Sequence, residues 1–452
     1  MKPTYFSNPY PNMTKQEIYR SKLGTLQDAL DLIQGGDCLI WPIHANEPKL
    51  FLDNLHTIAP RLDKPVDLWA IVHRFKHEVL SSTDPSMDVF QISSFFFDGQ
   101  TRKTHAAGTR RVTYFPSDLH KFSEELNLAK RPNVFVAQVS AMDEFGYCHC
   151  VSCQQWAQEN FETAEKVIYE VNPRLPMGFG EGALPVERAD VIYELTEEQS
   201  IAGIPIVEDP PMTPEEQAVA DYVVSLARDG DCFQLGFGGI PAAIGNSLTS
   251  KWDLGIHSEQ FSTSMAKLMA NGNVSNRHKA IDQRVSVAAF AIGNQFMYDY
   301  MDHNPRIHTR RGTYTNDPMN IMKNDNVLSI NGGLQYDLTG QICSESIGPS
   351  QFSGTGGATD FAYGAFHSKG GRGIIASVST TKKGTLSRIV PTLQSGSVVS
   401  VSRNLADYVV TEYGIAKLRQ RTVKQRAENL IAVAHPDFRA ELRKQASELL
   451  YF

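Results

Sequence analysis

The sequence predicts an α/β fold of two similar, open and largely parallel domains, and three observations lead to that prediction. A chain of 452 residues is longer than one hydrophobic core usually organises. Strand-like apolar runs alternate with helical patterns, which is typical of parallel sheets that carry helices on both faces. The two halves are also similar in sequence: Gly36-Asp-Cys-Leu-Ile and Gly230-Asp-Cys-Phe-Gln each follow a predicted helix with periodic apolar residues.

The sequence similarity continues downstream and suggests that one α/β unit was duplicated. In the same register, Val66-Asp-Leu-Trp-Ala-Ile falls opposite Trp252-Asp-Leu-Gly-Ile-His, and His73 falls opposite Glu259. The alternative is that Gly-Asp before a strand is only common turn chemistry. If the halves are related, the second alone keeps a glycine loop and an acid, since the first has Pro42-Ile-His-Ala45 in place of the loop.

A linker divides the two predicted domains. The segment Glu208-Asp-Pro-Pro-Met-Thr-Pro-Glu-Glu contains two chain breakers, and a helix start follows them. Thr213 is the expected N-cap, Pro214 takes the first helical position, and Glu216 completes a capping box. We therefore predict domains over residues 1–211 and 212–452.

Beyond the linker, apolar runs predict further strands that alternate with helices. A helical and amphipathic segment, residues 419–450, is interrupted at His435-Pro436. The runs predicted as strands are Val285–Ile292, Val327–Ile330, Gly373–Val378, Ser397–Val401 and Tyr408–Val410.

Composition excludes several classes of protein. An apolar fraction of 41% with mixed charges describes a globular protein, and a net charge of −7 argues against a general nucleic-acid binder. Residues 1–25 show no signal-peptide pattern, and no apolar window of 18 residues predicts a membrane span. Six cysteines in so long a chain do not suggest a disulfide framework, so we expect a cytoplasmic location.

The segment from Asp231 to Phe261 is the most informative part of the chain. The strand-like run Phe233–Leu235 stops at Gly236-Phe-Gly-Gly-Ile-Pro, and a helix start follows with Pro241 in its first turn. Glycines at such a turn leave backbone N–H groups bare beside a helix N-terminus, which suits a phosphate or an oxyanion. Glu259 follows the apolar run Leu254–Ile256, so we expect it at the carboxyl end of the next strand, where open α/β sheets bind ligands.

These motifs resemble the acetyl-CoA hydrolase/transferase family, in particular its butyryl-CoA:acetate and 4-hydroxybutyrate CoA-transferase branch. The similarity runs over essentially the whole chain and is strongest after about residue 210. The resemblance implies two CoA-transferase-like domains, with the catalytic glutamate in the second, and a homodimer. Beside Gly236–Pro241 and Gly255–Glu259, the matching motifs are Tyr314-Thr-Asn-Asp317, Ser353-Gly-Thr-Gly-Gly357, Asp360-Phe361, Val410-Thr-Glu-Tyr-Gly414 and His435-Pro-Asp-Phe-Arg439.

Glu259 is the predicted catalytic residue. A carboxylate attacks a thioester readily enough because the departing thiolate is stable. Attack on an acyl-CoA would give a mixed anhydride, and the returning thiolate would leave a glutamyl-CoA thioester, which is covalent catalysis with ping-pong kinetics. This chemistry needs no metal and no redox cofactor, and coenzyme A is a substrate. The alternative is that Glu259 is a solvated loop residue or a helix cap.

The CoA and substrate contacts are predicted from the two glycine loops and their surroundings. The second loop can supply backbone N–H groups to an oxyanion, and Asn331 a side-chain donor, although Asn331 could equally be a turn former. Lys382, with Lys383 and Arg388 nearby, suits the CoA phosphates, or else forms a solvated charge cluster. The predicted binding residues are Gly236, Phe237, Gly238, Gly239, Ile240, Asn331, Leu334, Gly356, Gly357 and Lys382.

Two features depart from a simple transfer of the family pattern. Relatives usually carry glutamine after the second loop, whereas this chain has Ala358, which puts the acyl preference in doubt. Soft metal ligands could come from Cys148-His-Cys-Val-Ser-Cys153. Two observations favour buried thiols instead: alternate cysteines would share one face of a strand, and no second Cys/His cluster lies nearby.

The sequence therefore predicts a CoA-transferase that acts on acetate and a short acyl-CoA, such as butyryl-, propionyl- or 4-hydroxybutyryl-CoA. An acetyl-CoA hydrolase is the nearest alternative, since it would use the same glutamate if water reached the glutamyl thioester. A nicotinamide dehydrogenase is disfavoured because the first loop lacks the third glycine of the dinucleotide fingerprint. A non-catalytic CoA-binding subunit is disfavoured by the intact acid and loops. The residues do not identify the acid pair.

Overall fold

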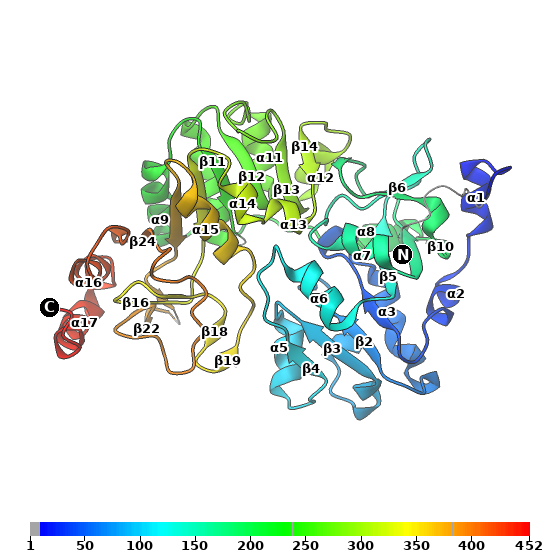
Figure 1. Ribbon diagram of the computed structural model, residues 1–452, viewed down its shortest axis with the longest axis horizontal. Coiled ribbons are helices and arrows are strands. Elements are labelled where there is room, and N and C mark those ends of the chain that lie inside the picture. Colours follow the sequence, from blue (N-terminus) through cyan, green and yellow to red (C-terminus); the bar gives the residue numbers. More distant parts are fainter. Residues whose placement is uncertain (1–9, 237, 382) are drawn as a thin grey trace.

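The first half of the chain forms a seven-stranded sheet in which all neighbouring strands are parallel. The computed structural model describes residues 10–236, 238–381 and 383–452. Figure 1 shows this sheet within the half of the molecule that is coloured from blue through cyan to green. Across the sheet the order is β10 (Val191–Glu194), β7 (Lys166–Val171), β5 (Val134–Val139), β1 (Cys38–Ile40), β2 (Val66–Trp69), β3 (Phe90–Ser94) and β4 (Val112–Tyr114).

The second half forms a nine-stranded sheet that is parallel except at one edge. Only the pair β24 and β25 runs antiparallel among its paired strands. The order is β25 (Gly414–Lys417), β24 (Tyr408–Thr411), β20 (Arg372–Ala376), β15 (Val327–Asn331), β11 (Cys232–Leu235), β12 (Gly255–Phe261), β13 (Ser286–Ala291), β14 (Ile307–Thr309) and β8 (Phe179–Gly180).

The two sheets repeat one topology. In each, the chain lays four strands outward in one direction, then returns beside the first strand and adds three in the other direction. Thus β1, β2, β3 and β4 correspond to β11, β12, β13 and β14, and β5, β7 and β10 correspond to β15, β20 and β24. The predicted fold of two similar, largely parallel α/β domains is confirmed. The boundary near residue 211 stays a prediction, and strand β8 from before it joins the second sheet.

Helices cover both sheets, and the helix after the linker starts as predicted. Helix α9 (Pro214–Leu226) has Thr213 as N-cap and a capping box with Glu216. The other helices are α1 (Lys15–Ser21), α2 (Leu26–Asp31), α3 (Lys49–Asn54), α4 (Glu78–Ser81), α5 (Gly99–Ala106), α6 (Phe122–Lys130), α7 (Ala157–Thr163), α8 (Glu197–Ala202), α10 (Gly239–Ser247), α11 (Thr263–Ala270), α12 (Gln295–Met301), α13 (Gly312–Thr315), α14 (Pro318–Ile321), α15 (Ala358–His367), α16 (Val423–Ala432) and α17 (Pro436–Glu448).

Two sequence predictions need correction. Ser397–Val401 is not a strand, because Val401 makes only an isolated bridge to Ile342 and Val398 N–H donates to the Ser346 hydroxyl. The strand that carries Glu259 is longer than predicted. It continues to Phe261, so Glu259 lies inside its carboxyl-terminal part rather than after it.

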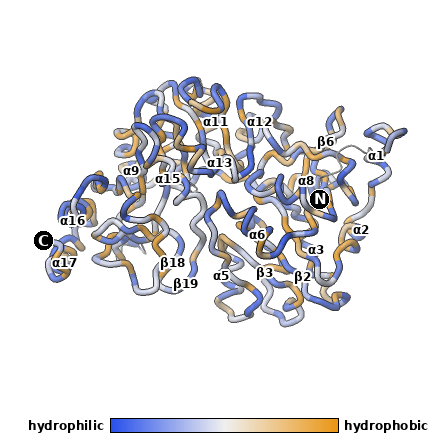
Figure 2. The backbone as a smooth tube through the Cα atoms, in the orientation of Figure 1, coloured by the Kyte–Doolittle hydropathy of each residue, from blue (hydrophilic) through white to orange (hydrophobic). Residues whose placement is uncertain are grey.

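One small sheet, β6 with β9, belongs to the first half, and the other small sheets and the C-terminal helices belong to the second half. Helices α16 and α17 meet at His435, as predicted, and Figure 2 shows hydrophobic and hydrophilic segments alternating along them. Within the described residues, no helix is both long and apolar enough to cross a membrane. The short strands are β6 (Tyr147–His149), β9 (Ala183–Pro185), β16 (Gln335–Asp337), β17 (Ile342–Cys343), β18 (Ser346–Ile347), β19 (Ser350–Gln351), β21 (Thr380–Thr381), β22 (Leu386–Ser387) and β23 (Ile389–Val390).

Candidate active site

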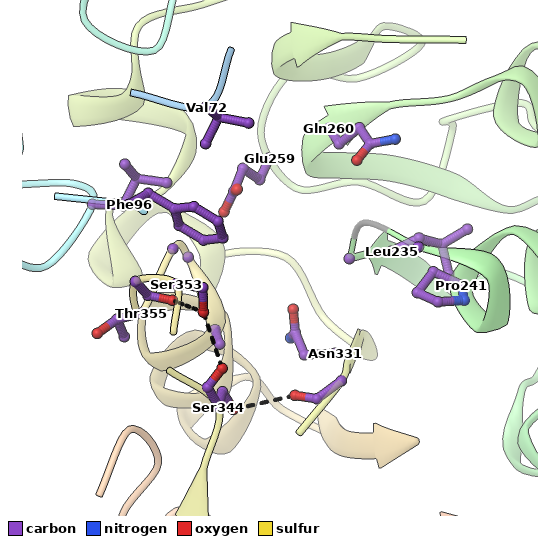
Figure 3. A pocket seen from close by; sticks show the side chains of 18 of the residues that line it. Val72, Phe96, Leu235, Pro241, Glu259, Gln260, Asn331, Ser344, Ser353 and Thr355 are labelled. Atoms are coloured by element: carbon purple, nitrogen blue, oxygen red, sulfur yellow. Dashed lines mark hydrogen bonds between the residues drawn. The ribbon is translucent and has the colours of Figure 1, made fainter. Parts of the chain in front are cut away.

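A cavity of about 520 Å³ lies between the two halves, and Glu259 is in its wall. The first half contributes mainly apolar side chains, among them Val72, Phe96 and Trp156. The second half contributes both glycine loops. Figure 3 shows Val72 and Phe96 next to the Glu259 carboxyl, on the side away from Leu235 and Pro241. The cavity lies beside the carboxyl ends of β11 and β15, where the strand order of the second sheet reverses, as expected for a ligand site in an open α/β sheet.

The Glu259 carboxyl is half-buried and is held by few groups. Its Oε2 accepts a hydrogen bond of 3.1 Å from Asn316 Nδ2. Loss of hydration raises the pKa of Glu259 to about 7, and the charge of Asp360 adds to that rise. Hydrogen bonds from Asn316 and the Gly357 backbone act in the opposite direction on this pKa. At neutral pH a substantial share of the Glu259 carboxyl is therefore ionised.

The second glycine loop is pressed against this carboxyl. A Cβ atom at Gly357 would lie 2.0 Å from Glu259 Oε2 and 2.4 Å from Asn316 Nδ2. On the other side, a Cβ at Gly354 would lie 2.1 Å from the carbonyl oxygen of Phe95. Gly356 has a φ of +54°, which favours glycine. The loop thus fits between the first half and the carboxyl only because these positions lack side chains.

The first glycine loop forms the opposite wall. Gly236 N–H donates to the Ile330 carbonyl at 2.8 Å, which ties the loop to the end of β15. Gly238, with a φ of +127°, is the N-cap of α10, and no side chain caps that helix. Gly239, Ile240 and Pro241 also line the cavity. Uncapped N–H groups at a helix start can bind a ligand oxygen.

Of the remaining predicted binding residues, some line the cavity and others lie outside the described residues. Asn331 and Leu334 line the cavity, but Asn331 Nδ2 already donates to Gln234 Oε1 at 3.2 Å and to Ser329 Oγ at 3.0 Å. Phe237 and Lys382 lie outside the described residues. Arg388 lines the cavity and donates to the carbonyl oxygens of Gly333 and Leu334.

Sequence reasoning missed the residues that hydrogen-bond to the Glu259 carboxyl or to the neighbouring Asp360. Asn316 was visible only as part of a matching motif. His120, from the first half, binds Asp360 through an Nδ1 to Oδ1 contact of 2.7 Å, and its backbone N–H donates to the other oxygen at 3.1 Å. Asp360 lies in the first turn of α15, directly after the second loop. Nothing in the sequence pattern pairs residues 240 positions apart.

The cysteine cluster is packed into the core. Cys148, Cys150 and Cys153 are free thiols with no exposed surface, and the Cys150 thiol donates to the Cys153 carbonyl at 3.5 Å. Burial raises the pKa of all three thiols. Over the described ranges, no group of three or more His, Cys, Asp or Glu side chains is arranged to hold a metal ion. This packing is what the buried-thiol interpretation predicts.

Comparison with known proteins gives matches along nearly the whole chain. Residues 7–208 match the acetyl-CoA hydrolase/transferase N-terminal domain, and residues 293–446 match the C-terminal domain of the same name. Succinyl-CoA:cyclohexane-1-carboxylate CoA transferase of Geobacter metallireducens is 40% identical over 436 residues, which is 96% of this chain and 97% of that protein. The 4-hydroxybutyrate coenzyme A transferase of Clostridium kluyveri is 37% identical over 437 residues, 96% of this chain and 99% of that protein. The crystal structure of RipA from Yersinia pestis matches with a TM-score of 0.89 at 34% identity, covering 97% of this chain and all of that chain (100%).

Proposed function

The chain belongs to the acetyl-CoA hydrolase/transferase family, and we propose that this CoA-transferase moves CoA between a short-chain acyl-CoA and acetate through a glutamyl-CoA thioester on Glu259. The acyl group is butyryl-, propionyl- or 4-hydroxybutyryl-like. The observation that carries the proposal is the Glu259 carboxyl, which faces a largely apolar cavity while Asn316 Nδ2 donates to it at 3.1 Å.

CoA exchange proceeds through two half-reactions, one for each acid. The Glu259 carboxylate attacks the thioester carbonyl and expels CoA thiolate, which leaves a mixed anhydride. The thiolate attacks the glutamyl carbonyl and releases the first acid as its carboxylate, so that CoA is now bound to Glu259. Acetate then attacks this thioester, and the same steps in reverse give acetyl-CoA and free Glu259.

The glycine loops suit the charges that develop in these steps. Each attack produces a tetrahedral oxyanion, and backbone N–H groups that are fixed beforehand stabilise such an oxyanion. Gly356 and Gly357 lie beside the nucleophile, and the start of α10 lies across the cavity. We assign the acyl oxyanion to the second loop and the CoA moiety to the first loop, with Leu334, Asn331 and Lys382 as further binding residues.

A single assay separates transferase from hydrolase. We expect butyryl-CoA to be converted to acetyl-CoA only when acetate is present, because the apolar wall keeps water from the glutamyl thioester. Chromatography of the thioesters with and without acetate measures this. Release of free CoA at the same rate in both cases would mean a hydrolase, and no reaction with any acyl-CoA would mean a non-catalytic subunit.

The activity should depend on pH through Glu259. The attacking form is the carboxylate, so kcat/KM should fall as the pH drops through the Glu259 pKa of about 7. Asn316 donates to that carboxylate, and Asn316→Ala should therefore move the midpoint of the profile to higher pH. The measurement is kcat/KM for butyryl-CoA across the pH range. A midpoint that stays in place in Asn316→Ala would contradict this role of Asn316.

Ala358 should influence the choice of acyl group. It is buried, lines the cavity and begins α15, beside the second loop. The next residue, Thr359, is not among the residues that line the cavity, and its hydroxyl donates to the Ser400 carbonyl at 2.5 Å. We expect Ala358→Gln to lower kcat/KM for butyryl-CoA and for a branched acyl-CoA while sparing acetyl-CoA. Equal effects on all three donors would show that this position does not contact the acyl chain.

A further inference from the structure

Besides strand β8, a second short segment of the first half, residues 152–155, pairs with the second sheet. Residues 152–155 run alongside β13: Ala291 N–H donates to the Ser152 carbonyl at 2.9 Å, and Gln154 N–H donates to the Ala289 carbonyl at 2.7 Å. Cys153 forms an antiparallel bridge with Phe290 between these two bonds. Strand β13 is the neighbour of β12, which carries Glu259. The segment therefore brings a first-half side chain, that of Gln155, close to the nucleophile.

Gln155 contacts both ends of the short helix that carries Asn316. At the start of α13, Gly312 N–H donates to the Gln155 carbonyl at 3.0 Å, and a Cβ atom at Gly312 would lie 2.1 Å from Gln155 Nε2. Just past the end of the helix, Gln155 Nε2 donates to Asn316 Oδ1 at 3.3 Å. Asn316 is fully buried and Gln155 is 2% exposed, so neither amide can turn to bulk water.

These contacts determine which way the Asn316 amide faces. Its oxygen accepts from Gln155, and its Nδ2 must then face Glu259, to which it donates at 3.1 Å. A reversed amide would place an oxygen against a carboxylate, which is repulsive. A donor at this position favours the ionised form of a carboxyl. A chain of two hydrogen bonds thus runs from the Gln155 amide to the Asn316 amide and from there to the Glu259 carboxylate, which accepts.

We propose that Gln155 is a positioning residue that fixes the Asn316 amide so that its N–H group supports the Glu259 nucleophile. The proposal rests on the proposed function. If it is correct, the ionisation of Glu259, in the second half, depends on the Gln155 side chain, in the first half. Gln155 lines the same cavity as Glu259, but the hydrogen bond of its side chain goes to Asn316, so its effect on Glu259 runs through Asn316.

The test is the pH profile of kcat/KM for butyryl-CoA with acetate in Gln155→Glu and Gln155→Met. Glutamate has nearly the same shape, but its carboxylate cannot donate to Asn316, and it adds a negative charge near Glu259. We expect the midpoint in Gln155→Glu to rise by about one pH unit, the usual scale for a lost hydrogen bond to a charged group. Gln155→Met, which loses the donor without adding charge, should give a smaller shift in the same direction.

Matched variants separate positioning from structural damage. Gln154→Glu places the same change one residue away, on a side chain that bonds Cys150 rather than Asn316, and should leave the midpoint in place. In an Asn316→Ala background, Gln155→Met should add no further shift, because its route to Glu259 is gone. Turnover that falls equally at every pH with an unmoved midpoint, or no change in either Gln155 variant, would overturn the proposal. Absence of exchange in the unaltered enzyme would instead overturn the proposed function.

Discussion

Glu259→Ala should lower CoA exchange at least about a hundredfold, the usual scale for loss of a covalent nucleophile. No other carboxyl in our scheme can form the glutamyl thioester. Glu259→Gln keeps the shape and the contact with Asn316 but removes the nucleophile, and should be equally inactive. Glu259→Asp should retain little activity, because its carboxyl is set back by one methylene from the substrate carbonyl.

The rates of acetyl-CoA formation from butyryl-CoA and acetate measure these effects. Far-ultraviolet circular dichroism and a thermal melt on each variant serve as controls for folding. More than about one hundredth of the original turnover in Glu259→Ala would rule out the nucleophile assignment, on the same scale.

Gly357→Ala should also abolish most activity, although it adds a single methyl group. The new Cβ would lie 2.0 Å from Glu259 Oε2, so the carboxyl, the loop or both must move. The φ of Gly357 is −89°, which alanine adopts without strain, so the effect is steric. A displacement of about 1 Å at reacting groups costs roughly a hundredfold in rate.

Gly332→Ala is the matched control for this substitution. Gly332 is in the wall of the same cavity, but an added Cβ there would meet no atom within 4 Å. We expect it to keep turnover within a few-fold of the unaltered enzyme. Equal turnover in Gly357→Ala and Gly332→Ala would show that the second loop does not constrain Glu259.

Local sequence patterns predicted the fold well because they report local physics. The Thr213 cap, the break at His435-Pro436 and the glycine loop after β11 each depend on neighbours within a few residues, and the structure has all three. The prediction of a strand at Ser397–Val401 was wrong because it, too, used only the local pattern. Its apolar residues suggested a sheet, but side-chain bonds to the Ser346 region hold this segment outside the large sheet.

The candidate site was only half visible from the sequence. Glu259 and the glycine loop before it stand out because they follow two successive apolar runs, and most of the predicted binding residues do line one cavity. The residues that support Glu259 and Asp360 gave no such signal. Gln155 and His120 act across the two halves, on Asn316 and Asp360, and such pairing depends on how the sheets pack.

The central claim is the covalent intermediate, and one measurement tests it most directly. The enzyme is incubated with butyryl-CoA without acetate, treated with borohydride, digested and analysed by mass spectrometry. Our account predicts lost activity and reduction of the Glu259 side chain to an alcohol, which requires a thioester at that carboxyl. An unmodified Glu259 in an enzyme that still exchanges CoA, or a modification at another residue, would contradict it.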